Sequence, residues 1–212
     1  MGGVYTSPYT ATIDGVSTPV ICDDFTSESF QGLNWMATAT DLGTLTGGTA
    51  STSVKFEQND AATQQFDYSV ISYLSVELMQ VDQSTAAGQT AAGEMSYAIW
   101  DVFDPAADLS SPDPLTGTEL AAIGNPLEGY TSGYLYNAEQ EVTTLGLTPT
   151  NFSTRTGYNV TIYTPTPNQN FTQEFVSVSA PEPSAPALLG VYLSSLVGLI
   201  FLFRRRVVRT VT

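Results

Sequence analysis

A long uncharged stretch near the C-terminus restricts the possible folds of this chain more than any other feature. Residues 187–203 contain no charged side chain and are followed directly by Arg204, Arg205 and Arg206. A helix of this length rises about 25 Å, which is enough to cross a short bilayer core. Because arginines favour the cytoplasmic side of a span, the sequence predicts a single transmembrane helix with a basic cytoplasmic tail at 204–212. Residues 1–180 would then lie on the opposite side of the membrane from this tail.

A proline motif precedes the apolar stretch. Pro181, Glu182 and Pro183 form a Pro-Glu-Pro triplet within a proline-rich linker at 179–186. The triplet, the apolar span and the arginine cluster, in this order at the C-terminus, resemble the PEP-CTERM sorting signal of Gram-negative bacteria. The resemblance implies export, transient anchoring in the inner membrane and removal of the tail by an exosortase, a membrane peptidase, in bacteria that make exopolysaccharide.

Export also calls for an N-terminal signal peptide. Residues 1–5 have neither the basic segment nor the apolar segment of such a signal. Either the chain is truncated or its natural start lies upstream of Met1. We favour the upstream start because Val4 and Tyr5 are already typical of a strand.

Composition excludes several classes of function. The chain has 21 acidic and 6 basic residues, and Lys55 and Arg155 are the only cations before residue 181. So few cations exclude a nucleic-acid partner, since they cannot neutralise phosphates. With no histidine and one cysteine, the chain lacks the histidine bases of nucleophilic catalysis, intrachain disulfides and multi-cysteine metal sites. We therefore predict a non-enzymatic protein without a cofactor.

Residues 1–178 carry the patterns of one exported domain. We predict a mainly β fold, antiparallel and sandwich-like within the α+β class, with a central helical insert. A hairpin is expected around the Asp14-Gly15 turn. The strands are expected at 9–13, 16–21, 34–42, 158–164 and 171–178. The helices are expected at 61–79 and 90–103, with shorter ones at 119–123 and 130–142.

Two short motifs in this domain resemble the thioester domains of bacterial surface adhesins. They are Ile-Cys-Asp-Asp-Phe at 21–25 and Ala-Ile-Trp-Asp at 98–101. In that family a cysteine bonds to a glutamine two residues before Ala-Ile-Trp. Ser96 stands at that position here, and a serine cannot supply the acyl carbon. We therefore predict no internal thioester and a buried, unreactive Cys22 packed against Trp100.

Four aspartates accompany these motifs. If the two motifs meet in space, Asp23, Asp24, Asp101 and Asp104 would come together. Carboxylate oxygens suit calcium, and two carboxylates can also hydrolyse a glycosidic bond. Solvated or hydrogen-bonded aspartates are the interpretation we favour, with calcium second and catalysis third.

The sequence as a whole predicts a sorted surface protein. The leading hypothesis is a structural or adhesive protein that is held in the inner membrane and then moves to the cell surface or extracellular matrix. Its expected partners are the inner membrane, an exosortase and exopolysaccharide. The alternatives are a secreted polysaccharide hydrolase that uses Asp and Glu pairs, and a receptor domain with a permanent tail anchor.

Overall fold

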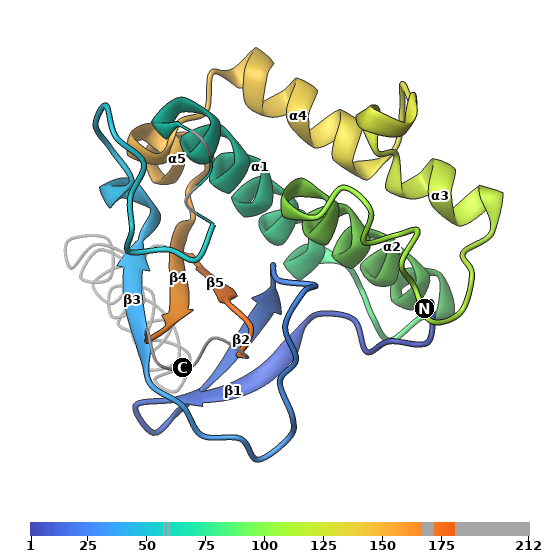
Figure 1. Ribbon diagram of the computed structural model, residues 1–212, viewed down its shortest axis with the longest axis horizontal. Coiled ribbons are helices and arrows are strands. Elements are labelled where there is room, and N and C mark those ends of the chain that lie inside the picture. The colour runs from blue at the N-terminus through green and yellow to red at the C-terminus, as the bar shows by residue number, and fades with distance from the viewer. Residues whose placement is uncertain (57, 59, 167–171, 181–212) are drawn as a thin grey trace, which may run out of the picture. The chain divides into compact units, whose positions relative to one another are not determined.

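The computed structural model describes residues 1–56, 58, 60–166 and 172–180 (Figure 1). Its strands form one antiparallel sheet in the order β1-β2-β5-β4-β3. The bounds are β1 Tyr9–Ile13, β2 Val16–Cys22, β3 Ala37–Asp41, β4 Asn159–Pro165 and β5 Phe175–Ser179. The last strand of the body therefore lies in the middle of the sheet, between strands from the two ends of the body.

The hairpin of β1 and β2 forms where the sequence predicts it. Ile13 pairs with Val16, so the loop has two residues. Asp14 and Gly15 have φ angles of 50° and 83°. Two successive positive φ angles are what a tight turn between twisted strands requires, and Asp-Gly adopts them at low cost.

The helices lie between β3 and β4 in the sequence and gather on one side of the sheet (Figure 1). Their bounds are η1 Leu42–Thr44, α1 Ala61–Gln80, α2 Ala86–Phe103, α3 Gly117–Ile123, η2 Pro126–Glu128, α4 Tyr134–Leu145 and α5 Pro149–Thr156. α1 is the central helix, since it contacts β5 and α5 as well as α2 and α4. The core forms where its apolar side chains meet the inner face of the sheet.

The two long helices begin at side-chain caps. The Asp60 carboxylate accepts a hydrogen bond from the Thr63 amide at 2.9 Å, at the predicted start of α1. The Thr85 hydroxyl accepts one from the Gly88 amide at 3.0 Å. α2 therefore begins four residues earlier than its apolar periodicity predicts, because a cap satisfies amides that the helix itself leaves unpaired.

The fold prediction is confirmed in its coarser form. The chain has an α+β fold with an antiparallel sheet and a helical insert. The prediction of a mainly β, sandwich-like domain is wrong for the described residues, where more residues are helical than extended. Every described strand belongs to one sheet, and α1 and α2 pack where a second sheet would lie.

The helical share exceeds the prediction partly because of α5, which the apolar pattern did not indicate. Thr148 caps this helix, Pro149 occupies its first turn, and the Asn151 side chain accepts a hydrogen bond from the Thr148 amide at 2.9 Å. Proline is favoured in the first turn because its missing N–H would be unpaired there anyway. Local capping therefore outweighs the weak apolar periodicity of this segment.

The body ends at the proline linker. Residues Met1–Ala180 form one compact unit. In the part of the chain that the structure describes, no helix is long and apolar enough to cross a membrane. The predicted span at 187–203 lies outside the described residues.

Candidate functional site

The two adhesin-like motifs meet at the end of β2. The Trp100 indole N–H donates to the carbonyl oxygen of Cys22 at 3.0 Å, and both side chains are buried. The predicted burial of Cys22 beside Trp100 is confirmed. Burial, the main cause, and the neighbouring Asp23 charge raise the pKa of the Cys22 thiol well above its usual range. At neutral pH the sulfur is therefore a poorly nucleophilic thiol.

Ser7 lies between Ser96 and Cys22 and is hydrogen-bonded to both. The Cys22 amide donates to the Ser7 hydroxyl at 3.0 Å, and the Ser7 amide donates to the Ser96 hydroxyl at 3.0 Å. The Ser96 hydroxyl in turn donates to the carbonyl of Ala92 at 2.8 Å. The position of the adhesin glutamine is thus occupied by a hydroxyl that holds the N-terminal segment against α2.

Next to Cys22 lies a set of polar groups, all buried except the half-buried Lys55, which we name the polar core cluster: Asp23, Asp24, Lys55, Tyr68 and Glu174. The strand register explains how residues so distant in sequence meet. Cys22 pairs with Phe175 across antiparallel β2 and β5, so the residue after Cys22 and the residue before Phe175 lie at the same edge. α1 contributes Tyr68, and the loop before α1 contributes Lys55.

Glu174 accepts three hydrogen bonds inside this cluster. Its donors are the Tyr68 hydroxyl at 2.6 Å, the Lys55 backbone amide at 2.8 Å and the Thr164 hydroxyl. Burial raises the pKa of Glu174, and these donors lower it in part because they stabilise the ionised form. Glu174 is therefore better prepared to carry a negative charge than an isolated buried carboxyl.

Asp23 has the opposite environment. Its side chain is 0% exposed, and the side-chain group within hydrogen-bonding reach of its carboxyl is the carboxyl of Glu174. Burial first, and then the charge of Glu174, raise the pKa of Asp23 well above its usual range. Two adjacent buried carboxyls do not both ionise readily, so Asp23 is the one that keeps its proton.

Asp24 pairs with the only lysine of the chain. Its Oδ2 forms an ion pair with Lys55 Nζ, while its Oδ1 accepts from the amide and the hydroxyl of Thr26 at 3.0 and 2.9 Å. The Asp24 side chain is 0% exposed, and that of Lys55 is 24% exposed. The Lys55 ammonium also contacts the Ser27 hydroxyl and lies 5.9 Å from the centre of the Phe56 ring.

Asp101 and Asp104 belong to other contacts. Asp101 accepts from the Asp108 amide at 3.2 Å and from the Asn125 side-chain amide at 3.3 Å. Burial and the neighbouring Asp108 raise the pKa of Asp101 to about 8. Asp104 ends α2 and accepts from the Ala106 amide in the following turn at 3.4 Å.

The four candidate calcium ligands therefore do not form one site. In the segments that the structure describes, no three cysteine or acidic side chains are grouped so that they could hold a metal ion. Asp23 and Asp24 face Glu174 and Lys55, while Asp101 faces Asp108. Asp24, Asp101 and Asp104 accept hydrogen bonds, as the interpretation that we favoured expects, whereas Asp23 is buried beside the Glu174 carboxyl.

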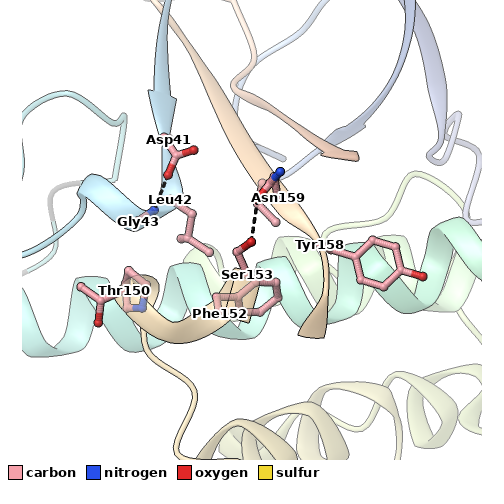
Figure 2. Close-up of a pocket in the computed structure, with 10 residues that line it drawn as sticks. Asp41, Leu42, Gly43, Thr150, Phe152, Ser153, Tyr158 and Asn159 are labelled. Atoms are coloured by element: carbon pink, nitrogen blue, oxygen red, sulfur yellow. Dashed lines mark hydrogen bonds between the residues drawn. The ribbon is translucent and has the colours of Figure 1, made fainter. Parts of the chain in front are cut away.

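A shallow pocket lies between η1, α5 and β4 (Figure 2). Its volume of about 200 Å³ is below the roughly 300–1,000 Å³ of typical ligand sites. Its polar groups are already paired, because Asp41 accepts from the Gly43 amide at 2.7 Å and the Ser153 hydroxyl donates to Asn159 at 2.6 Å. Tyr158 points away from them in Figure 2. The pocket therefore offers a ligand little free hydrogen-bonding capacity.

The sequence prediction missed three members of the polar core cluster: Lys55, Tyr68 and Glu174. Lys55 carried one signal, since a lone lysine in so acidic a body needs a carboxylate partner. Tyr68 and Glu174 sit in an ordinary helix and strand pattern and gave no signal. The predicted sorting residues Pro181, Glu182 and Pro183, and the arginines at 204–206, lie outside the described residues.

Comparisons of the chain with protein-family models, curated proteins and solved structures found no match.

Proposed function

We propose that this chain is an exported structural or adhesive protein that is anchored by its C-terminal span and then released by cleavage at the Pro-Glu-Pro segment. The inner membrane holds it first, an exosortase-type peptidase removes the tail, and the body moves to the cell surface or the exopolysaccharide matrix. The body itself carries out no catalysis.

One observation gives this proposal its main support. The last strand ends at Ser179, the compact unit ends at Ala180, and the triplet begins at Pro181. Cleavage at or after the triplet would leave all the described strands and helices in one piece. A sorting signal that is cut away requires such a boundary, since a cut within β5 would remove a strand from the middle of the sheet.

The charge of the body fits a location among polysaccharides. All the acidic residues except Glu182 lie before residue 181, together with only two cations. A strong net negative charge keeps a released domain soluble and opposes self-association.

The hydrolase alternative finds less support in the geometry. Asp23 and Glu174 do form a carboxyl pair, but both side chains are 0% exposed. A glycan therefore has no access to this pair in the structure. The second alternative, a permanently anchored receptor, is an outcome of the experiment that follows.

The test is the C-terminus and location of the mature protein in its producing bacterium. We expect the wild-type body in the medium or matrix fraction, with a mass showing that residues 187–203 are gone. Glu182→Ala should leave full-length chain in the membrane fraction. The control is Glu28→Ala, which removes an exposed acidic residue of the body and should be processed normally. Full-length wild-type chain that remains in the membrane, or that is soluble inside the cell, would contradict the proposal.

A further inference from the structure

Lys55, the only lysine of the chain, forms its ion pair with Asp24, whose carboxyl is fully buried. Lys55 Nζ and Asp24 Oδ2 are in direct contact, and the Asp24 side chain is 0% exposed. We propose that these two side chains become joined by an amide bond, so that the mature body contains an internal Lys55–Asp24 cross-link.

The carboxyl of Asp24 is held in the orientation that such a reaction needs. Both Thr26 donors bind Oδ1, so this oxygen is fixed as the one that stays on the carbon and bears negative charge when an amine attacks. Oδ2 is left facing Lys55 Nζ. A nucleophile held against an oriented carbonyl reacts as if it were present at very high concentration.

The surroundings favour a neutral product. Asp24 is 0% exposed and lies beside the buried Cys22, whose sulfur accepts from the Asp24 amide at 3.4 Å. Burying two opposite charges carries a desolvation penalty that an amide would not carry. The same exclusion of solvent keeps water away from the bond once it has formed. Asp23, whose pKa is raised by burial, carries its carboxyl proton in the residue next to Asp24.

The reaction is a condensation and needs no oxidant. A proton passes from the ammonium to the carboxylate within the ion pair, which leaves a neutral amine and a neutral acid. Nζ then attacks Cγ of Asp24, a second nitrogen proton moves to Oδ2, and the Cγ–Oδ2 bond breaks. The products are a secondary amide, which retains one hydrogen on Nζ, and one molecule of water.

The cross-link would connect the end of β2 to the loop that leads into α1. The joined residues are 31 positions apart, and closing a loop of this size in the unfolded chain reduces its entropy. The described part of the body contains no disulfide, because Cys22 is free. The amide would therefore supply the covalent restraint that a single-cysteine chain cannot make from sulfur.

The test uses the protein isolated from its producer, in whichever processed form it occurs. Its mass under denaturing conditions should be lower by one water than its sequence requires. Trypsin gives a second readout, because Lys55 is the only lysine and Arg155 is the next cleavage site. The unfolded cross-linked chain should resist cleavage after Lys55 and give one fragment spanning 1–155. A mass that matches the sequence, with separate fragments 1–55 and 56–155, would overturn the proposal.

Two variants separate this bond from other dehydrations. Lys55→Arg keeps a cation beside Asp24 but has no amine that can form the bond, so it should have the full sequence mass. Asp24→Asn should form the same amide by losing ammonia instead of water. If Lys55→Arg is still lighter by one water, the dehydration lies elsewhere and the proposal fails. Since none of these readouts depends on tail processing, the result stands apart from that of the proposed function.

Discussion

At the scale of single residues, the two buried carboxyls Asp23 and Glu174 of the polar core cluster differ in their hydrogen-bond partners. Glu174 accepts from Tyr68, Lys55 and Thr164, whereas the side-chain partner of Asp23 is the Glu174 carboxyl. An aspartate whose pKa is raised by folding binds its proton more tightly in the folded chain than in the unfolded chain. The folded state then binds more protons above the ordinary pKa of 3.8, so the free energy of unfolding falls as the pH rises from there.

Asp23→Asn removes this dependence, because an amide stays neutral at every pH. In the wild type, Asp23 makes the free energy of unfolding fall with pH by up to about 1.4 kcal/mol per pH unit. Between pH 5 and 8 we expect the slope of the variant to be shallower by this amount. Urea unfolding at several pH values measures the slope. Asp14→Asn, in the β1–β2 turn, removes one negative charge from an exposed site and serves as the control. An unchanged slope in Asp23→Asn would show that Asp23 is ionised in the folded protein.

Trp100 gives a second test at this scale. Trp100→Phe keeps a ring in the core but removes the N–H that donates to the Cys22 carbonyl. A buried acceptor left without its donor costs about 1–3 kcal/mol. Urea unfolding should show a loss of this size. Trp35→Phe is the matched control, since Trp35 is half-buried and stacks on Phe175 through its ring. Equal losses in the two variants would assign the effect to ring size rather than to the hydrogen bond.

At the scale of helices and strands, local signals were predictable and distant pairings were not. The Asp14-Gly15 turn and the apolar spacing of α1 each lie within one short segment, so they can be recognised without the rest of the chain. The position of β5 beside β2 depends on contacts across more than a hundred residues. The β2–β5 pairing also brings Glu174 next to Asp23. Because this pairing could not be recognised from the sequence, we expected Asp101 and Asp104 beside Asp23 instead.

The early start of α2 can be tested at its cap. Thr85→Ala removes the oxygen that accepts from the Gly88 amide, which should cost about 1 kcal/mol of stability. Thr90→Ala changes an exposed threonine inside the same helix and should be neutral or slightly stabilising, because alanine has the higher helix propensity. Chemical denaturation of both variants measures the difference. Equal stabilities would show that the first turn of α2 contributes little to the fold.

At the scale of the whole chain, the sheet order determines where the body can be cut. β5 pairs with β2 on one side and with β4 on the other, so the sheet is complete only when the chain reaches Ser179. The first position where cleavage would remove no paired strand is therefore after Ser179, and the Pro-Glu-Pro segment begins two residues later. From the sequence we placed the end of the domain at residue 178, where the last expected strand ends, and the compact unit ends at Ala180.

Two truncated chains test whether the body needs β5 in order to fold stably. A chain ending at Ala180 should unfold cooperatively, with a melting temperature close to that of the processed wild-type body, because every described strand is retained. A chain ending at Gln173 lacks β5 and the buried Glu174, which leaves β2 and β4 without a partner on one side and Tyr68 without its acceptor. It should show no cooperative transition by circular dichroism. If both chains melt alike, β5 does not hold the sheet together, and a cut before β5 would be as harmless to the body as one after it.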